Sequence, residues 1–319
     1  MDDLERRVVE RLSHGTSLEG LGLGRVGGRW DLRGMRFSDV ERRPGPAVGG
    51  YSSVGLAGFD QLNNVRLEGL DLTGAVWESL RLTSVEVSDC VLDGARLYDL
   101  RMWDSHWHDC SLRATRLRSG SMGGTTPLWR RSRTTSWKGV DFTEADLRDS
   151  AHQYESYTDC DFSRARLDGV DFDGARHVRS RFAGRVEDVS FRRRPLLGLS
   201  VGPVNAMLDV DFTEAQLVGC GFWDLDLRQV KLPSTEEHVI ARPKVAVARR
   251  VLELLATAEL TDALIGLRVA MGFWQRTGPD TVHAWGVVDR AFLSESPEEL
   301  LRAIALLDQA IAEVAGPMP

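Results

Sequence analysis

The stretch CDFSRARLDGVDFDGARH, residues 160–177, places a large apolar residue at every fifth position. Phe162, Leu167 and Phe172 are these central residues, and smaller apolar residues stand two positions before them. A helix needs apolar residues every three or four positions, and a strand needs them at every second position. The period of five fits neither element and therefore indicates a repeat architecture.

The same period covers more than half of the chain. Every fifth residue from Leu62 to Leu117 is apolar, and the spacing resumes at Trp137 and runs to Phe182, interrupted by two histidines. It reappears at Phe191, slipped by one position, and again from Phe212 to Leu232. We interpret the array as one continuous repeat with interruptions.

Each quintet has two inward and three polar positions, which suits one short side of a narrow coil. Stacked coils pair their backbones at a spacing of about 4.8 Å and so satisfy their amide groups. The period alone does not decide between three and four sides per coil. All four cysteines fall on the second inward position, which predicts small buried side chains.

The repeats also carry a family resemblance. VDFTEADLRDS (140–150), VDFTEAQLVGCGF (210–222) and the opening stretch resemble the pentapeptide-repeat family, whose pattern is A(D/N)LXX. The resemblance implies an all-β solenoid: a right-handed quadrilateral parallel β-helix with four quintets in each coil. About seven coils are then expected, giving a rod roughly 35 Å long at the strand spacing of a sheet.

The rest of the chain divides around this array. Residues 1–61 hold a short amphipathic helix (2–13) expected to cap the rod, the early centres Leu32 and Phe37 outside the main array, and an insertion. Residues 62–233 form the β-helix, interrupted by loops at about 118–136 and 192–206. Residues 234–319 are expected to be α-helical and to offer a dimer interface. One or two helices are predicted over 244–274, and one over 296–315.

Carboxylates recur beside the central residues of the second half of the array, where they are expected to face solvent at regular spacing. They provide either a solvated coat or a binding surface for a partner. Whether they collect on one face is left open, because the insertions obscure which quintet belongs to which face. The predicted partner-binding acids are Asp141, Glu144, Asp146, Asp161, Asp168, Asp171 and Asp173.

The loop at 118–136 is the second candidate surface. It combines an aromatic residue with several cations, and loops on a rigid scaffold often carry recognition. The predicted loop residues are Trp129, Arg130, Arg131 and Arg133.

Two histidines and a glutamate occupy inward positions of the array: His152, His177 and Glu155. Buried polar groups need partners, so these positions indicate a local distortion, access to solvent near an end or loop, or a pocket lined by these residues. A lesser alternative is an enzyme with a pocket between the rod and the helical region, using these histidines, His238 or His283.

The chemical motifs give no catalytic, metal or cofactor site. GLGRVG (22–27) matches a dinucleotide-binding pattern but lacks the preceding strand, and GLSVG (198–202) matches a nucleophile elbow but lacks its strand–turn–helix. We therefore expect no catalytic residues, no metal and no cofactor.

The functional expectation is a non-catalytic protein-binding rod. The resemblance implies a DNA mimic that binds DNA gyrase or topoisomerase IV and gives resistance to a toxin or antibiotic, without binding nucleic acid directly. The alternative is a scaffold or adaptor that uses the Arg/Trp loop or the helical region. No apolar run is long enough to span a membrane, and a cytoplasmic homodimer joined by the C-terminal helices is expected.

Overall fold

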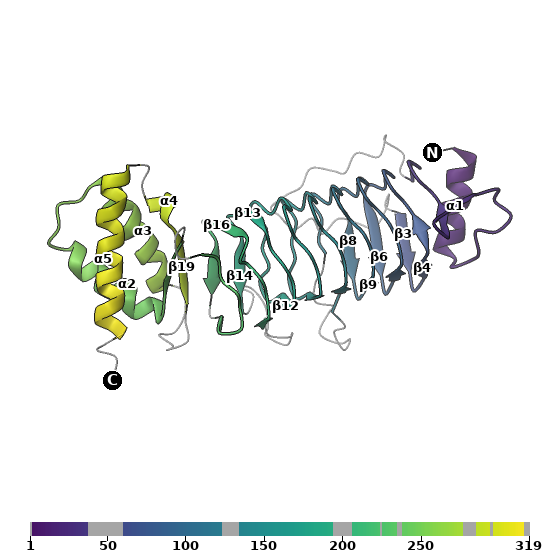
Figure 1. Ribbon diagram of the computed structural model, residues 1–319. Coiled ribbons are helices and arrows are strands. Elements are labelled where there is room, and N and C mark those ends of the chain that lie inside the picture. Colours follow the sequence, from purple (N-terminus) through teal and green to yellow (C-terminus); the bar gives the residue numbers. More distant parts are fainter. Residues whose placement is uncertain are drawn as a thin grey trace.

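The computed structural model shows a rod of stacked coils with a helix at one end and a group of helices at the other (Figure 1). Most of each of the three predicted interruptions lies outside the described residues, as do all four predicted residues of the Arg/Trp loop. The structure describes residues 2–37, 60–122, 134–193, 206–223, 225–234, 238–276, 285–293 and 296–315.

A parallel sheet of seven short strands runs along one side of the rod. Its strands pair in register over whole coils, so that Leu67 lies beside Val87, and Val87 beside Trp107. Each coil therefore takes twenty residues, or four quintets, where no insertion intervenes. The seven strands are β4 (Arg66–Glu68), β7 (Glu86–Ser88), β9 (His106–His108), β10 (Ser136–Lys138), β11 (Ser156–Thr158), β12 (Arg176–Val178) and β15 (Met207–Leu208).

Shorter sheets and isolated parallel bridges complete the other sides of the rod. Most of these sheets are parallel; β1 and β2 pair antiparallel before β2 joins β5. The remaining rod strands are β1 (Arg25–Val26), β2 (Arg29–Asp31), β3 (Asp60–Asn63), β5 (Leu70–Asp71), β6 (Leu80–Thr83), β8 (Arg101–Trp103), β13 (Gly184–Glu187), β14 (Ser190–Arg192), β16 (Ala215–Val218) and β17 (Gly221–Trp223).

Left-handed residues turn the chain at the corners of the coils. After the strands of the long sheet this position holds Gly69 (φ 62°), Asp89 (φ 50°) and Asp109 (φ 54°). Glycine has no Cβ to clash in this conformation, and aspartate tolerates it better than most residues do. The Gly and Asp that recur between the apolar positions are thus explained by the turns.

The interior confirms the central residues read from the sequence. Phe162 and Phe172 are fully buried, and Leu167 is 1% exposed. Phe162 stacks between Phe142 and Phe182, with ring centroids 4.9 Å and 4.8 Å apart. Aromatic rings at equivalent positions of successive coils therefore form a continuous column of contacts inside the rod.

Leu32 and Phe37 belong to the same stack, so placing them outside the main array was wrong. The Leu32 amide donates to the Asp71 carbonyl and the Phe37 amide to the Val76 carbonyl, each at 2.8 Å. Both side chains are fully buried. The slip expected at Phe191 is confirmed, because Asp171 pairs with Ser190, one position short of a whole coil.

The first helix, α1 (Asp3–Ser13), lies across the first coils. Asp2 accepts a hydrogen bond from the Glu5 amide, and Glu5 accepts one from the Asp2 amide, so the helix begins with a capping box. Val8 and Leu12 are buried in the same apolar core as the rod. Residues 2–13 thus form the amphipathic helix read from the sequence.

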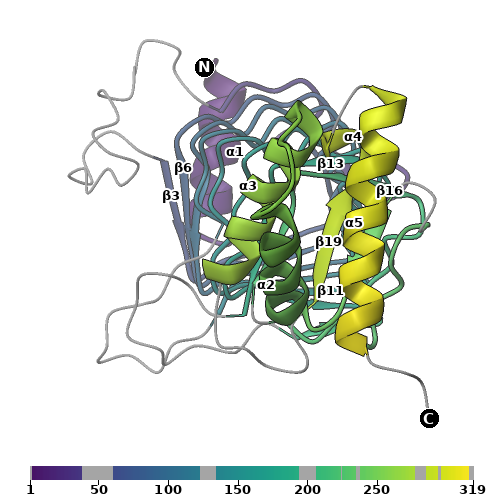
Figure 2. The ribbon, with the colours of Figure 1, turned by 90° about the vertical axis from the view of Figure 1, so that its left-hand side faces the viewer.

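A second apolar core lies at the other end, within α2 (Lys244–Leu255), α3 (Asp262–Arg276) and α5 (Pro297–Ala315). α5 begins at Pro297 with Glu298 and Glu299 in its first turn, as expected of a helix N-terminus. Viewed along the rod, these helices stand in front of the coils (Figure 2). No described helix is long and apolar enough to cross a membrane.

The sequence did not predict the connection between rod and helices. An antiparallel pair, β18 (His238–Ala241) and β19 (Gly286–Asp289), contacts the last coils on one side and the helices on the other (Figure 1). A short helix, α4 (Arg290–Leu293), follows β19. Ile240 and Val287 pack against the rod core, whereas Val239 and Val288 belong to the helical core.

Candidate functional site

The predicted acids do not lie on one face of the rod. Asp141 and Asp161 share a column of paired residues that we call the aspartate column. Asp146 lies on a second column, between Arg116 and Arg166, and Asp171 lies on a third, between Ala151 and Ser190. The aspartate column consists of Asp71, Val91, Ser111, Asp141, Asp161, Arg181, Asp211 and Lys231.

Several of these aspartates have a local structural role. Oδ1 of Asp141 accepts a hydrogen bond from the Thr143 amide at 2.8 Å, and Oδ1 of Asp161 accepts one from the Ser163 amide at 2.8 Å. Asp211 does the same with Thr213 at 2.9 Å. An Asp followed two residues later by Thr or Ser therefore shapes the turn of the coil.

Arginines of neighbouring coils neutralise many of the acids. Glu144 pairs with Arg164 at 2.9 Å, one coil further on, and Asp141 pairs with Arg113 at 2.8 Å. Burial works to raise the pKa of Asp141, but the hydrogen bonds from Thr143 and Arg113 outweigh it and lower the pKa. The faces therefore carry charges of both signs rather than a uniform acidic field.

Asp173 corrects the expectation that all these carboxylates face solvent. It is 2% exposed and lies 2.9 Å from Arg192 Nε, and the Ser190 hydroxyl donates to it at 3.0 Å. Burial, together with the neighbouring carboxyl of Asp171, raises the pKa of Asp173 to about 7 although Arg192 opposes the shift. Asp168, by contrast, is exposed.

His152, Glu155 and His177 are enclosed by the rod, so the alternative that they have access to solvent was wrong. His152 is 1% exposed, and Glu155 and His177 are not exposed. Trp137 Nε1 donates to Glu155 Oε2 at 2.9 Å, the Tyr157 hydroxyl donates to the same oxygen, and His152 Nδ1 lies 2.6 Å from that hydroxyl. Glu155 and His152 are thus joined through Tyr157 inside the rod.

His152 has a polar partner on each ring nitrogen. The Ser150 hydroxyl donates to the Leu147 carbonyl and lies 2.8 Å from His152 Nε2. Together with the contact between Nδ1 and the Tyr157 hydroxyl, both ring nitrogens have a partner inside the rod, as a buried polar side chain requires.

His177 has no comparable partners. Neither ring nitrogen has a hydrogen bond within the described part of the chain. Its ring stacks on Tyr157 with centroids 5.0 Å apart. Burial, with a smaller contribution from the charge of His152, lowers the pKa of His177 to about 3. His177 therefore acts as a neutral ring within the aromatic column.

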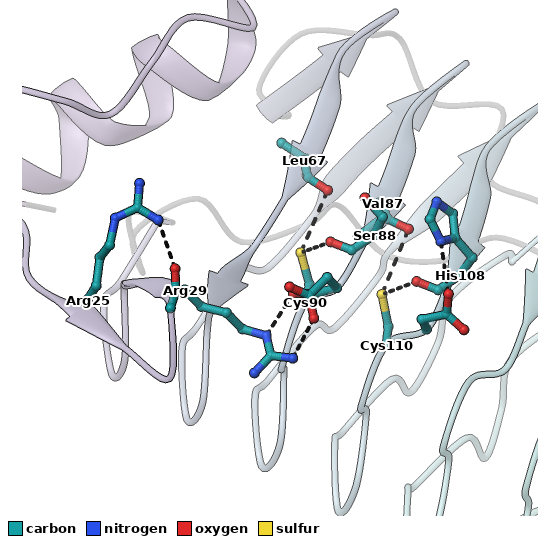
Figure 3. A network of polar contacts seen from close by, with 11 residues as sticks. Arg25, Arg29, Leu67, Val87, Ser88, Cys90, His108 and Cys110 are labelled. Carbon is teal, nitrogen blue, oxygen red and sulfur yellow. Dashed lines mark hydrogen bonds and ion pairs between the residues drawn. The ribbon is translucent and has the colours of Figure 1, made fainter.

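The cysteines are free thiols on the inner wall. Cys90 Sγ donates to the Ser88 carbonyl at 3.2 Å, and Cys110 Sγ repeats the contact with the His108 carbonyl at 3.3 Å one coil later (Figure 3). On the outside, Arg29 pairs with Asp89 at 2.5 Å and so joins the first coil to a later one (Figure 3). These contacts are structural.

A cavity of about 400 Å³ lies between the last coils and the helical region. The rod contributes β14, β17 and their neighbours, and the helical side contributes α3 and β19 with Trp285 before it. No histidine is among its lining residues, and His238 instead accepts the Leu217 amide at 3.0 Å through Nε2. His283 lies outside the described residues. The walls include Asp188, Arg192, Phe222, Trp223, Lys244, Ala270, Trp274, Trp285, Val287 and Asp289.

Two cations approach the same indole in this cavity. The guanidinium carbon of Arg192 lies 4.4 Å from the Trp223 ring centroid, and Lys244 Nζ lies 5.4 Å from it. Lys244 is 2% exposed and donates to the Phe222 carbonyl at 2.8 Å. The sequence reasoning missed these residues, because only the docking of the helices brings them together.

Comparison with known proteins identifies the repeat. Residues 61–99 match the model of pentapeptide repeats, with eight copies. Residues 61–99 therefore carry pentapeptide repeats, the family that the array resembles. No curated protein matches the sequence.

Among solved structures, the solenoid is similar to QnrB1, a plasmid-mediated fluoroquinolone resistance protein, at 14% identity and a TM-score of 0.30 over 64% of this chain and 89% of that one. It is also similar to Rfr23 of the cyanobacterium Cyanothece 51142, at 14% identity and a TM-score of 0.31 over 37% and 86%. HetL of Nostoc sp. strain PCC 7120, involved in heterocyst differentiation regulation, gives 14% identity and a TM-score of 0.19 over 65% and 93%.

Proposed function

We propose that this pentapeptide-repeat protein is a non-catalytic protein-binding rod that acts as a scaffold. The β-helix holds charged faces in a fixed array, and the helical region makes the apolar protein contact. The observation that carries the proposal is the location of exposed apolar side chains. Among the described residues, the large ones that are exposed are Leu260, Ile265, Val269 and Leu301, all in the helical region.

The geometry of the rod follows from the same proposal. Four quintets per coil support a quadrilateral cross-section, for which the family resemblance implies right-handed winding, and the burial of Val8 and Leu12 supports a capping role for α1. The rod core includes Val8, Leu32 and Phe37, so we group the described part of residues 1–61 with the β-helix at 62–233 and propose a helical domain at 234–319 as the second part. A rod so closed at both ends is protected from adding further strands.

The first partner that we propose is a second copy of this chain. Ile265 lies on α3, 47% exposed, with Asp262 and Arg268 exposed one turn to either side. In an antiparallel pairing centred on Ile265, Asp262 faces Arg268 of the partner subunit. The patch is therefore self-complementary in charge as well as apolar, as a two-fold interface requires.

Sedimentation velocity over a wide range of protein concentration tests this contact. The proposal predicts a species of twice the 35.5 kDa chain mass that dissociates on dilution. A species of single mass at every concentration would contradict it. The measurement needs no knowledge of other partners.

DNA mimicry is the second candidate function, and the aspartate column favours it. Asp141, Asp161 and Asp211 lie in one line along the rod, as phosphates lie along a duplex, whereas Asp71 in the same line is buried. Arg181 and Lys231 in the same line, and the pairing of Asp141 with Arg113, weaken the field. We therefore rank mimicry of DNA at gyrase or topoisomerase IV, with resistance to a toxin or antibiotic, below the scaffold.

A gyrase supercoiling assay distinguishes DNA mimicry from the scaffold function. Mimicry predicts that excess protein competes with DNA, and that Asp161→Lys weakens this competition while Glu86→Lys, on another column, leaves it unchanged. Supercoiling that is unaffected by the protein, with and without a quinolone, would leave the scaffold as the remaining function. In either case we propose that the protein acts in the cytoplasm.

A further inference from the structure

We propose that the cavity between the last coils and the helical region binds a small planar aromatic anion. This binding site is separate from the apolar protein contact on α3. Its ligand would hold the rod and the helical region together, because both contribute walls.

The cavity has the size and lining of a small-molecule site. Its volume of about 400 Å³ falls within the range of ligand pockets, roughly 300 to 1,000 Å³. Phe222, Trp223, Trp274 and Trp285 contribute aromatic surface, and Val287 and Ala270 add aliphatic surface. Flat aromatic walls of this kind favour a planar ligand, which they contact by stacking.

Glycines allow two of these rings to lie close to the backbone. A Cβ at Gly286 would come within 2.5 Å of the Trp274 ring, and one at Gly221 would come within 2.3 Å of Trp223 Nε1. Only a residue without a side chain permits these approaches. Gly221 on β17 and Gly286 on β19 thus allow the indoles of Trp223 and Trp274 to occupy these positions.

The polar groups of the cavity favour an anion. Arg192, which also pairs with Asp173, and the almost completely buried Lys244, which also donates to the Phe222 carbonyl, both lie against Trp223. Within the described residues, the indole Nε1 atoms of Trp223 and Trp285 are buried and have no hydrogen-bond acceptor. An indole N–H can only donate, so a ligand that brings acceptor oxygens would satisfy both groups.

Two carboxylates also line the cavity and must be weighed against the cations. Asp188 is exposed at the edge of the site, where water screens its charge, whereas Asp289 on the β19 wall is 5% exposed. A cationic ligand would pair with these acids but would leave both indole N–H groups without an acceptor and would meet Lys244. The anion therefore satisfies more of the groups present.

Fluorescence titration with 8-anilinonaphthalene-1-sulfonate tests the site, because this probe is aromatic and anionic. The neutral N-phenyl-1-naphthylamine, which has the same rings without the sulfonate, is its matched control. We expect one sulfonate probe to bind per chain, about tenfold more tightly than the neutral probe, which corresponds to one charge contact of about 1.4 kcal/mol. Equal affinity for the two probes would overturn the assignment of an anion.

Two variants locate the binding in the cavity. Lys244→Met keeps the buried chain length and should reduce sulfonate affinity about tenfold while leaving the neutral probe unchanged. Ala270→Phe fills the cavity and should abolish binding of both probes. Circular dichroism and thermal unfolding confirm that each variant is folded.

The exposed apolar side chains of the helical region provide the control surface, because the probe also binds such patches. The variant Ile265→Ser/Leu301→Ser should bind the sulfonate probe as the unmodified protein does. Binding that is lost in this variant but survives Ala270→Phe would overturn the proposal, as would the absence of any binding to the unmodified protein.

Discussion

The rod and the helical region bury their apolar residues by different means, and their surfaces differ accordingly. In the rod each quintet directs two side chains inward and three outward. Each coil therefore buries its own apolar side chains and presents polar ones to solvent. In the helical region the core forms between helices, and Ile265, Val269 and Leu301 remain exposed. The five-residue repeat buries its apolar residues within the coil, whereas the amphipathic helices leave apolar surface exposed, where a partner can bind.

The comparison extends to charge. On the rod, acids and arginines one coil apart face each other, as Glu144 faces Arg164 and Asp159 faces Arg179. Counting acidic residues along the sequence therefore overstates the negative field of the rod. The helical region places exposed apolar residues such as Ile265 beside the exposed charges of Asp262 and Arg268, a combination that suits a contact surface.

The largest expected effect comes from removing a central side chain in each region. Phe162→Ala should cost about 3 to 5 kcal/mol and Leu267→Ala about 2 to 5, because each leaves a cavity in a close-packed core. Native-state hydrogen exchange should show lost protection at 134–193 for the first and at 244–276 for the second. Equal loss over both regions in either variant would show that the two cores form a single cooperative unit.

The next effect concerns the unpartnered histidine of the rod. His177→Phe should raise the free energy of unfolding by about 1 to 3 kcal/mol, since it removes two buried nitrogens without hydrogen bonds and keeps the ring stack. His152→Phe is the matched control and should destabilise, because Tyr157 and Glu155 lose their partner. Urea unfolding of the two variants measures both effects.

The pH dependence of His177 has a defined sign. Its pKa is lowered from 6.5 to about 3 in the folded chain, so the unfolded chain binds the proton first as pH falls. Stability should therefore decrease below pH 6.5, by at most about 1.4 kcal/mol per unit, and this decrease should vanish in His177→Phe. A decrease of the same slope in the variant would contradict the assignment.

The contribution of Asp173 to the pH dependence of stability has the opposite sign to that of His177. Its pKa is raised from 3.8 to about 7 in the folded chain, so the folded chain keeps a proton that the unfolded chain has lost. Stability should fall as pH rises from about 4 to about 7, and Asp173→Asn should remove this slope. Because the two slopes oppose each other in the unmodified protein, unfolding of His177→Phe across this range reveals the Asp173 slope most clearly.

The smallest effect is expected on the rod surface. Glu144→Gln breaks the exposed pair with Arg164 and should change stability by less than about 1 kcal/mol. Melting temperature at low and high salt measures it, and the difference between the variant and the unmodified protein should shrink at high salt. A larger loss would mean that the surface pairs stabilise the rod as strongly as its core does.

Much of the rod could be predicted from the sequence, because a period of five is met by a coil with sides of five residues. Phe162, Leu167, Phe172 and the slip at Phe191 follow from spacing alone. The face of the rod on which each quintet lies does not follow from spacing. His106 pairs with Ser136, so the insertion adds ten residues to a coil of twenty. Ten residues are two quintets, so the five-residue period continues unbroken through the insertion. Counting coils of twenty residues along the sequence would therefore place every later residue on the wrong face.

The interior network shows a signal that spacing could have revealed. His152 and Tyr157 are consecutive centres and Glu155 lies at the inward position between them, so the repeat itself brings the three together. The residues that line the cavity have no comparable spacing in the sequence. Trp223, Lys244 and Trp285 meet only because β19 docks on the last coils, and no local pattern encodes that contact.

The central claim is that protein contact is made by the helical region and that the rod is its support. Sedimentation velocity of Ile265→Glu beside Thr158→Glu tests it, since the first places a charge in the α3 patch and the second places one on the long sheet of the rod. We predict that Ile265→Glu sediments at the mass of one chain and that Thr158→Glu remains a dimer. A dimer that survives Ile265→Glu, or is lost in Thr158→Glu, would contradict the account.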